Sequence, residues 1–500
     1  MIPIGEYLSQ NARRLPEKEA LVSGGRRWTY AELDRETSAI AATLVAQGVR
    51  PGDRIGIIGA ASGDWVRLAF GITRCGGVIA ALNYRETPDR VARMMADVGV
   101  TRLFADPSSA KALAAEQLEC PVSDLTRDAV DGMAQGDEPG DIAVSPDGGA
   151  VILFTGGTTG LSKGVLLSHA NLFWNVINQV QGTRMDESDR TLIGTALHHS
   201  AAFNTWLLPT LYLGGTAIVL PEFTPEGWIE AVGRDGVTNG FTPPTMIRQI
   251  LSHPLAARTD WSQFRRWYSG AGGLSAEDRA AMEALVPGVG IYYEYGLTEA
   301  GPIVTCLRPE DYERAAPNSI GRAVRHCDIR ILREDRGTAG TGEAGEIAVR
   351  GPMVMSGYVN RPEETAKTFH DDWLLTGDLA TMDENGFITF LDRSKDMIKT
   401  GGLNVYSQEV EQVLADHPAI REVAVLGFND DTWGERVTAV VVLRDGASAS
   451  ERELIDFARS RLGGYQTPKS VVFLPFDALP RNYLGKILKR DLRIQLEAEE

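Results

Sequence analysis

The first hundred residues alternate between segments of helical periodicity and short apolar runs, and this alternation constrains the fold most strongly. Residues 30–47 carry apolar side chains at helical spacing, stop before Gly48, and lead into the apolar run at 54–58. The same order recurs at 65–75 with 78–82, and at 88–98 with 101–105. Helices and strands in alternation predict a mostly parallel α/β sheet that is covered by helices on both faces.

The pattern changes from about Pro317 onward. The segments DIRILRE, GEIAVRG and GFITFLD alternate in polarity and are separated by glycine-rich turns, which predicts a β subdomain. After Arg393 the order is helix, strand, strand, helix and strand, which predicts a compact α+β unit of about 100 residues. We therefore expect an α/β protein with a large N-terminal domain at 1–393, a β subdomain from about 317, and a small C-terminal domain at 396–500.

Composition narrows the possible functions. A chain of 500 residues predicts two or three domains, and its net charge of −17 disfavours a nucleic-acid partner. The four cysteines form no CxxC pair, which favours reduced thiols in a cytoplasmic protein. The N-terminus lacks the apolar core of a signal peptide, and the apolar stretch 206–221 is interrupted by Pro209 and two glycines. We expect a cytoplasmic enzyme without a transmembrane segment.

The stretch AVILFTGGTTGLSKGVLLSH at 150–169 is unusual, because a buried strand is followed by nine residues with one large apolar side chain. Small residues after a strand let backbone N–H groups approach an anion, and threonine hydroxyls and Lys163 add further donors. The string is not a Walker A loop. A plain surface loop is the alternative, but the lysine inside an apparent strand–loop–helix context favours a phosphate-binding loop.

Four further stretches accompany this loop. They are YEYGLTEAG at 293–301, WLLTGDLA at 373–380, LDRSKDMIKTGGLNVYSQEVE at 391–411 and LPRNYLGKILKRDL at 479–492. Together with the loop they resemble, in order and spacing, the adenylate-forming superfamily of acyl-CoA synthetases, luciferases and nonribosomal peptide adenylation domains. The resemblance covers nearly the whole chain.

The resemblance implies a two-step reaction that uses ATP, Mg²⁺ and coenzyme A. A carboxylate attacks the α-phosphorus of ATP to give acyl-AMP and pyrophosphate, and a thiol then displaces AMP. It also implies that the C-terminal domain is mobile and rotates between the two half-reactions about a hinge near 394–395. Such a rotation exchanges the groups at one site without releasing the reactive anhydride.

The resemblance assigns residues of the N-terminal part to the nucleotide and the metal ion. Glu299 matches the Mg²⁺ ligand, Thr298 contacts the α-phosphate, and Tyr295 beside Gly296 lies along the adenine. A solvated acid at a helix start is the alternative for Glu299. The phosphate loop would use Thr155, Gly156, Gly157, Thr158, Thr159, Gly160 and Lys163, with Ser162 where the family usually has proline.

A second set of matches lies near the C-terminus. Asp378 matches the ribose-binding aspartate, with a turn former as the alternative. Arg393 lies near the ribose in the family, Lys395 occupies the hinge position, and Lys399 with Gly401 and Gly402 faces the pantetheine arm of CoA. The family commonly has Glu at Leu403. Lys486 matches the lysine that neutralises charge during adenylation, although composition alone favours a surface lysine there.

Several residues are candidates for the pocket of the carboxylic acid. His198 and His199 would point to opposite faces of a strand, which argues against a shared metal ion. By resemblance His199 closes the carboxylate end of the pocket, and Gly272 and Gly273 of SGAGG line the acyl and adenine sites. Three larger side chains either shape the pocket or belong to the core, and they are Trp206, Phe241 and Met246.

The predicted function is that of an ATP-dependent acid–CoA ligase acting on an apolar acyl or aryl monocarboxylate. A fatty acid, an aryl acid and a short dicarboxylate are all open, but HHSAAFNTW at 198–206 contains no arginine for a second carboxylate. The main alternative is a stand-alone enzyme that loads a carrier-protein thiol. An oxidative luciferase-like activity has no support in the residues. A degenerate nucleotide-binding protein would be expected to lack Glu299 or Lys486.

Overall fold

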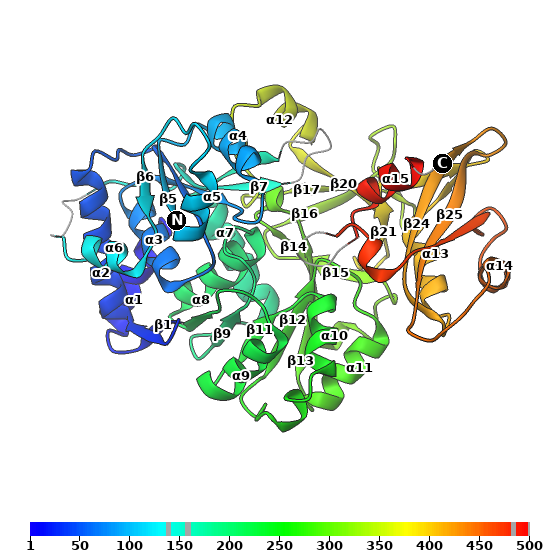
Figure 1. Ribbon diagram of the computed structural model, residues 1–500, viewed down its shortest axis with the longest axis horizontal. Helices are drawn as coiled ribbons and strands as arrows, with labels where there is room; N and C mark the ends of the chain where they lie inside the picture. Colours follow the sequence, from blue (N-terminus) through cyan, green and yellow to red (C-terminus); the bar gives the residue numbers. More distant parts are fainter. Residues whose placement is uncertain (137–141, 156–161, 482–486, 499–500) are drawn as a thin grey trace. The chain divides into compact units, whose positions relative to one another are not determined.

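The computed structural model describes residues 1–136, 142–155, 162–481 and 487–498. The chain forms two compact units (Figure 1), the first from residues 1–329 and 349–374 and the second from 330–348 and 375 onward. The chain passes between the units within strands β16 (Asp328–Leu332), β17 (Gly345–Arg350) and β20 (Trp373–Met382). The hinge predicted near 394–395 lies inside the second unit, and its role stays a prediction.

The first unit contains a seven-stranded sheet in the order β18-β8-β7-β4-β3-β5-β6. Strands β7, β4, β3, β5 and β6 run parallel, which confirms the α/β class expected from the alternating pattern. The strands are β3 (Arg54–Ile58), β4 (Val78–Leu82), β5 (Arg102–Ala105), β6 (Val122–Asp124), β7 (Gly149–Thr155), β8 (Lys163–Ser168) and β18 (Gly357–Tyr358).

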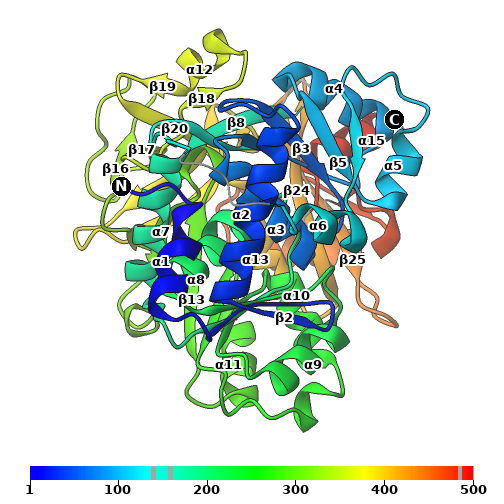
Figure 2. The ribbon, with the colours of Figure 1, turned by 90° about the vertical axis from the view of Figure 1, so that its left-hand side faces the viewer.

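Helices cover this sheet, and their ends follow from local sequence. The longest, α2, begins at a capping box in which Thr29 and Glu32 bond reciprocally, and it packs beside α3 (Figure 2). Helix α4 ends at Gly99, whose φ of 65° is left-handed. The helices are α2 (Tyr30–Ala46), α3 (Gly63–Arg74), α4 (Pro88–Val98), α5 (Pro107–Leu113), α6 (Arg127–Met133) and α12 (Pro362–Thr368).

A second sheet of the first unit has the order β15-β14-β13-β12-β11-β9-β10-β1-β2. It is parallel from β13 to β1 and antiparallel at both ends. Its strands are β1 (Glu19–Ser23), β2 (Arg26–Thr29), β9 (Arg190–Ile193), β10 (Thr216–Val219), β11 (Asn239–Phe241), β12 (Arg266–Gly270), β13 (Gly290–Gly296), β14 (Ile303–Leu307) and β15 (Ser319–Ala323); β19 (Phe369–His370) pairs with the start of β20.

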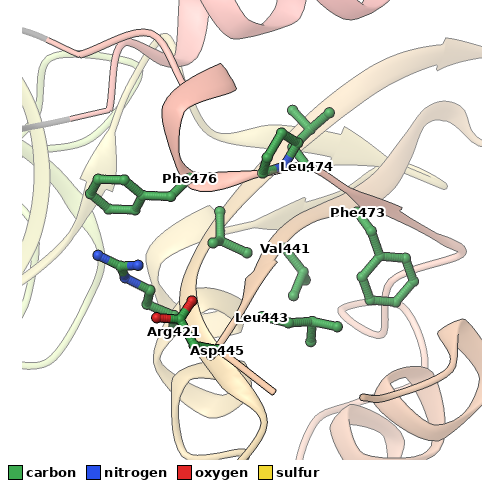
Figure 3. Close-up of a pocket in the computed structure, with 9 residues that line it drawn as sticks. Arg421, Val441, Leu443, Asp445, Phe473, Leu474 and Phe476 are labelled. Carbon is green, nitrogen blue, oxygen red and sulfur yellow. The ribbon is translucent and has the colours of Figure 1, made fainter. Parts of the chain in front are cut away.

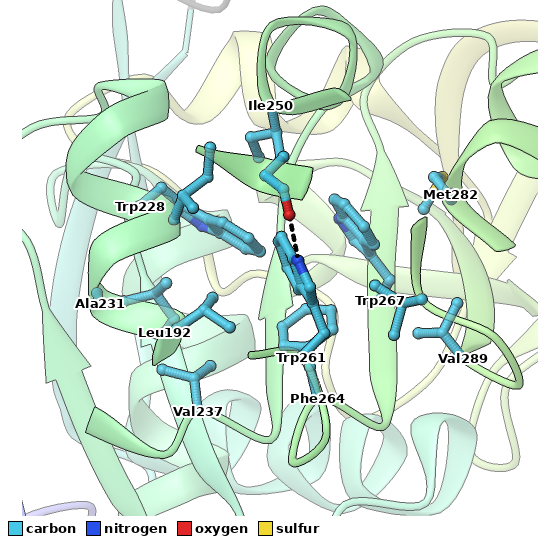
Figure 4. Close-up of a cluster of buried hydrophobic side chains, with 14 of the residues drawn as sticks. Leu192, Trp228, Ala231, Val237, Ile250, Trp261, Phe264, Trp267, Met282 and Val289 are labelled. Carbon is cyan, nitrogen blue, oxygen red and sulfur yellow. Dashed lines mark hydrogen bonds between the residues drawn. The ribbon is translucent and has the colours of Figure 1, made fainter. Parts of the chain in front are cut away.

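The helical segments that accompany this sheet include one π-helix. They are α1 (Glu6–Arg14), α7 (His169–Thr183), the π-helix η1 (Ala201–Leu207), α8 (Leu208–Leu213), α9 (Pro225–Asp235), α10 (Pro244–Ser252), α11 (Ala276–Leu285), and the 3₁₀ turns η2 (Ala256–Arg258), η3 (Thr298–Ala300) and η4 (Pro309–Asp311). Between the sheet and helices α9, α10 and α11 lies a buried cluster in which Trp228, Trp261 and Trp267 pack together (Figure 4). This apolar core holds the strands that carry the nucleotide motifs.

The second unit contains a smaller α+β structure, as its pattern of elements predicts. Its sheet has the order β23-β22-β25-β24, and β26 adds to β25 in parallel. The elements are β21 (Ile388–Arg393), β22 (Ile398–Thr400), β23 (Leu403–Val405), α13 (Ser407–Ala415), β24 (Ile420–Asp430), β25 (Gly434–Leu443), α14 (Glu451–Arg459), β26 (Ser470–Phe473), η5 (Phe476–Ala478) and α15 (Lys489–Glu497).

The strand–loop–helix arrangement expected for the phosphate loop is wrong. The loop does not lead directly into a helix, because β8 pairs with β7 in an antiparallel hairpin and α7 begins only at His169. The reason is the alternation after Lys163, where Val165 and Leu167 are buried on the same face of the strand while Leu166 is only half-buried. The groups predicted to bind an anion therefore belong to a segment that connects two paired strands.

Candidate functional site

Glu299 lies where three distant segments of the first unit meet. Its Oε1 atom accepts a hydrogen bond from Thr155 Oγ1 at 3.2 Å and another from Tyr358 Oη at 2.9 Å. Thr155 ends β7 and is the first residue of the predicted phosphate loop, so the predicted metal ligand is joined to the predicted loop by a direct contact. The structure thereby brings together two residues that the sequence assigned to the same nucleotide.

A tight turn holds Glu299 in place. Strand β13 ends at Gly296, and a Cβ atom there would lie 1.8 Å from the carbonyl oxygen of Pro302. Only glycine fits this close approach, which lets Leu297 N–H donate to the same carbonyl at 3.1 Å. The chain then continues through the 3₁₀ turn that carries Thr298 and Glu299. Gly296 therefore determines the position of Glu299 indirectly, because it permits the tight turn of the backbone that precedes it.

Lys163 begins β8 and carries its ammonium group toward two residues that the sequence analysis did not identify. Its Nζ atom forms an ion pair with Glu364 Oε2 at 2.7 Å and lies 4.7 Å from the ring centroid of Tyr358. Tyr358 reaches this position because β18 pairs with β8, opposite Val165. The segment GYVNRPEE at 357–364 carried no recognised chemical motif, so only its pairing with β8 reveals the connection.

The other nucleotide residues of the first unit lie close to these elements. Thr298 Oγ1 and Ser200 Oγ are 3.1 Å apart, which joins the nucleotide motif to the segment after β9. Tyr293 Oη donates to the carbonyl of Gly272 at 2.8 Å, and Tyr295 shares the face of β13 with Tyr293. Gly273 follows in the same loop and has open space where a Cβ would be. The contacts predicted between these residues and a nucleotide stay predictions.

The expectation for the two histidines is wrong in its geometry. His198 and His199 lie in a turn, not in a strand. Their rings therefore do not point to opposite faces but lie together, with centroids 4.0 Å apart. Burial lowers the pKa of His198 to about 3, with a smaller effect from Arg85. Burial, His198 and Arg85, in that order, also lower the pKa of His199 well below its usual value. Both imidazoles are therefore neutral at physiological pH.

The segment after the histidines is a π-helix, a form that often marks functional sites. Its Trp206 is 1% exposed and stacks on Tyr268 with ring centroids 4.4 Å apart and on Phe241 at 5.7 Å. Met246 is half-buried in α10. Trp206 and Phe241 thus belong to the packed interior, and the pocket role of all three residues stays a prediction.

In the second unit, Asp378 and Arg393 face each other across the β20–β21 ladder. Arg393 Nε lies 3.3 Å from Asp378 Oδ1, and the Asp378 side chain is 8% exposed. Asp378 lies within β20, not after it, and its backbone N–H donates to Thr376 Oγ1 at 3.1 Å. The two residues predicted for the ribose are therefore neighbours, and their contact with the ribose stays a prediction.

The predicted hinge and CoA residues lie in two turns and on one strand of the second unit. Lys395 is exposed in the turn after β21, where Asp396 N–H donates to the Arg393 carbonyl at 2.9 Å. Gly401 and Gly402 form the two-residue turn between β22 and β23, with φ of 57° and 78°. Positive φ at both central positions is the type I′ hairpin geometry. Lys399 is exposed on β22.

Six predicted site residues lie outside the described residues, and their assignments stay predictions. They are Gly156, Gly157, Thr158, Thr159, Gly160 and Lys486. The residues that flank the segment of Lys486 are described. Arg481 and Ile487 form an antiparallel bridge, and Arg481 Nη2 donates to Glu422 at 2.7 Å.

A buried polar network, which the sequence analysis missed, joins the end of β21 to the start of α15. Asp392 Oδ2 accepts from the backbone N–H and the hydroxyl of Ser407 at 2.5 and 2.6 Å. Lys489 Nζ donates to the same hydroxyl at 2.5 Å and pairs with Glu411 at 2.6 Å. Burial raises the pKa of Glu411, while Lys489 opposes that shift. The network connects the residue before Arg393 with the helix that follows Lys486 in sequence.

A separate pocket of the second unit contains none of the predicted site residues. It is lined by residues of β24, β25, the end of β26 and the segment that follows, and Figure 3 shows Arg421 beside Phe476 at its edge. The Arg421 guanidinium lies 3.9 Å from the Phe476 ring centroid. In the part of the chain that the structure describes, no three His, Cys, Asp or Glu residues are grouped to hold a metal ion. No helix in the described ranges is long and apolar enough to cross a membrane.

The fold and these motifs define a nucleotide-dependent, adenylate-forming enzyme, and comparisons with known proteins identify its family. The model of the AMP-binding enzyme family matches residues 8–359, and that of the AMP-binding enzyme C-terminal domain matches residues 409–486. The chain belongs to this adenylate-forming family and is an AMP-forming enzyme of the acyl-CoA synthetase type.

Similar proteins cover the full length of the chain. A feruloyl-CoA synthase from an Amycolatopsis species is 38% identical over 98% of both chains. An indoleacetate–CoA ligase from Aromatoleum aromaticum is 32% identical over 98% of this chain and 97% of its own. The crystal structure of ATP-bound MatB from Rhodopseudomonas palustris is 30% identical over 99% of both chains, with a TM-score of 0.90. These relatives support CoA ligation at the level of the family.

The residues around Glu299 fit the magnesium ion that is typical of this family. Mg²⁺ prefers oxygen ligands and often keeps several waters, so one carboxylate beside phosphate oxygens is sufficient. Both hydrogen bonds to Glu299 within the described residues fall on Oε1. Oε2 is therefore the oxygen that Glu299 would offer to a cation.

Proposed function

We propose that this chain is an ATP-dependent ligase that converts an aryl monocarboxylate into its CoA thioester, with release of AMP and pyrophosphate. The observation that carries the proposal is the direct contact of Glu299 with Thr155, beside Lys163 and Tyr358. The Glu299 carboxylate and the Thr155 hydroxyl are in contact, and Thr155 and the Lys163 ammonium group belong to the two strands that flank the loop predicted to hold phosphates. Such a group of charges suits a polyphosphate in complex with a divalent cation.

In the adenylation step, the protein must hold ATP while a carboxylate attacks the α-phosphorus. We assign Lys163 and the phosphate loop to the β- and γ-phosphates, Thr298 to the α-phosphate, and Glu299 to Mg²⁺, which would neutralise phosphate charge. Lys486 is assigned to the charge that develops between the carboxylate and the phosphorus, two anions that otherwise repel. The bond from the α-phosphorus to the bridging oxygen breaks, and pyrophosphate leaves.

The neutral histidine pair supports a packing role beside the acid. Because burial lowers the pKa of both imidazoles, neither is a cation that would pair with the carboxylate. His199 can therefore close the pocket while the carboxylate remains a nucleophile. An ammonium or imidazolium group in its place would lower the nucleophilicity of the carboxylate.

In the second step, the thiol of CoA attacks the acyl carbon and AMP leaves. We assign Asp378 to the ribose hydroxyls, since its two oxygens can accept from both, and Arg393 to the same region. Lys399, Gly401 and Gly402 are assigned to the pantetheine arm, and the chain around Lys395 to the hinge. The type I′ turn at Gly401 and Gly402 supports this assignment, because both residues present backbone without side chains and Gly402 has open space beside it.

The relatives favour an aromatic acid over a fatty acid as substrate. The 38% identical feruloyl-CoA synthase and the 32% identical indoleacetate–CoA ligase are both named for arylalkenoic or arylalkanoic acids. The rings of Trp206, Tyr268 and Phe241 stack on one another, and Trp206 belongs to the π-helix that follows the histidine pair in sequence. We therefore propose a hydroxycinnamate or arylacetate as the class to test first.

The experiment is pyrophosphate release with ATP, Mg²⁺ and a panel of hydroxycinnamic, arylacetic, fatty and dicarboxylic acids, run with and without CoA. Release with the aryl acids, with thioester formed only when CoA is added, is the expected result. Release with fatty acids alone would contradict the substrate class. Acid-dependent release without any thioester from CoA would contradict the proposed acceptor and indicate a carrier-protein thiol.

A further inference from the structure

We propose that Glu364 is a resting counter-ion of Lys163, which the phosphates of ATP must displace and to which Lys163 returns when pyrophosphate leaves. The inference rests on the proposed function, because it assumes that Lys163 binds the β- and γ-phosphates. Glu364 lies outside the motifs recognised in the sequence, so the inference adds a new residue to the proposed reaction.

The first argument is the position of Lys163 itself. Its side chain is 20% exposed, and its ammonium group is held between the Glu364 carboxylate at 2.7 Å and the Tyr358 ring at 4.7 Å. A cation over an aromatic face retains part of its stabilisation when its carboxylate partner leaves. The ring of Tyr358 can therefore support Lys163 in both pairings, with Glu364 or with phosphate.

The second argument is the position of Glu364, which keeps a partner after Lys163 departs. Arg361 Nη1 lies 2.8 Å from Glu364 Oε1, and Arg361 Nη2 lies 2.9 Å from Asp97 Oδ1. Hydrogen bonds from Lys163 and then Arg361 lower the pKa of Glu364, so the carboxylate is ionised at neutral pH. The exchange therefore leaves no buried charge unpaired, and both states are accessible.

The third argument is the link to the predicted metal ligand. The hydroxyl of Tyr358 donates to Glu299 Oε1 at 2.9 Å, while its ring faces Lys163. One side chain thus positions the predicted metal carboxylate and supports the predicted phosphate lysine. Tyr358 and Glu364 are positioning residues, because both act through the groups that meet the nucleotide.

The test is equilibrium binding of three ligands, ATP, pyrophosphate and AMP, to the full-length protein by calorimetry at low ionic strength. Glu364→Gln should tighten ATP and pyrophosphate by about two- to fivefold, the scale of a partly exposed ion pair. AMP should bind unchanged, since it lacks the two phosphates assigned to Lys163. In turnover, KM for ATP should fall more than kcat changes, and inhibition by pyrophosphate should strengthen.

Glu363→Gln is the matched control, because it removes the same charge from the exposed neighbouring position of α12. It should leave all three affinities unchanged. In a Lys163→Met background, which should itself weaken ATP and pyrophosphate but not AMP, Glu364→Gln should have no further effect. Glu364→Asp, which keeps the charge on a shorter side chain, should give an intermediate change and guards against a folding defect in Glu364→Gln.

Three results would overturn the inference. They are unchanged or weaker ATP binding in Glu364→Gln, equal tightening for AMP, and a full effect that persists without Lys163. The wild-type protein separates this failure from that of the proposed function. A wild-type protein that binds neither ATP nor AMP contradicts the proposed function, whereas normal ATP binding with an unaltered Glu364→Gln contradicts the counter-ion alone.

Discussion

At the scale of single residues, the segment YEYGLTEAG contains two glutamates, the buried Glu294 and the half-buried Glu299, whose hydrogen-bond partners differ. Glu299 accepts from two hydroxyl groups, whereas Glu294 lies in the core with one hydrogen bond, from Gln179 Nε2 at 2.7 Å. Alternation along β13 separates Glu294 from the face of Tyr293 and Tyr295. The sequence marks both as acids, and only the fold shows that they have different hydrogen-bond partners.

Replacement of the Glu299 carboxylate should separate metal-dependent chemistry from nucleotide binding. Glu299→Gln should lower acid-dependent pyrophosphate release roughly a hundredfold or more, because several kcal/mol of charge stabilisation are lost with the metal ligand. AMP should bind as it does to the wild-type protein. Glu283→Gln, on the exposed face of α11, is the control. Wild-type release by Glu299→Gln would contradict the assignment of the metal ligand.

Glu294 should make stability depend on pH. Burial raises its pKa to about 8 from 4.5. Since the folded state then binds the proton more tightly than the unfolded chain, this contribution to the free energy of unfolding is present below pH 4.5 and is lost as the pH rises to about 8. Glu294→Gln does not titrate, so its stability should match the wild type near pH 4 and exceed it above pH 8 by several kcal/mol.

The measurement for Glu294 is urea unfolding between pH 4 and pH 9, with both proteins at equal ionic strength. The difference in free energy of unfolding should grow through the window between 4.5 and 8. Parallel curves for the two proteins would contradict the raised pKa, because they would show that Glu294 binds its proton equally tightly in the folded and the unfolded chain.

At the scale of elements, contacts between strands and helices that are distant in sequence bring partner residues to the motifs. Strand β18 brings Tyr358 to β8, and the start of α15 brings Lys489 to α13. The sequence predicts neither β18 nor α15, but five other elements could be predicted, since the order helix, strand, strand, helix and strand after Arg393 matches α13, β24, β25, α14 and β26. Their neighbours could not, because register and strand order depend on contacts far apart in the chain.

The Lys489–Glu411 pair should be important for the stability of the second unit. Its side chains are 16% and 19% exposed. Lys489→Met should therefore lower the free energy of unfolding by about 2–4 kcal/mol, because Glu411 is left without its counter-ion in a largely apolar setting. The measurement is denaturant unfolding followed by circular dichroism.

Lys489→Met combined with Glu411→Gln provides the matched control. The glutamine keeps the acceptor for Val425 N–H, which donates to Glu411 Oε1 at 2.7 Å, and removes the unpaired charge. Most of the lost stability should return in the double variant. An unchanged loss would show that the lysine acts through its packing and not through its charge.

At the scale of the whole molecule, the proposed reaction requires two half-reactions that can be measured separately. Lys395→Pro fixes φ in the turn after β21 near −65° and should spare adenylation while it blocks thioester formation from supplied acyl-AMP. Lys486→Ala should show the opposite pattern. Lys395→Ala, which leaves the backbone free, is the control. Equal losses of both half-reactions in both variants would contradict the two-state account.

The sequence by itself determined the class of fold, the family and most of the predicted site, because these depend on local patterns. Periodicity and turn residues specify helices and strands, and contiguous motifs such as YEYGLTEAG place several chemical groups within one turn. The same local reasoning misplaced His198 and His199 and expected a helix directly after the phosphate loop, since local patterns do not show which strand a segment will pair with.

The tertiary structure alone decided which charges meet. Glu299 meets Thr155 and Tyr358, and Lys163 meets Glu364, although the partners in each contact are far apart in the sequence. The physical reason is that an ion pair needs two groups within a few ångströms, and that distance is set by strand pairing and core packing. Sequence supplied the charged residues of this site, and the fold selected their partners.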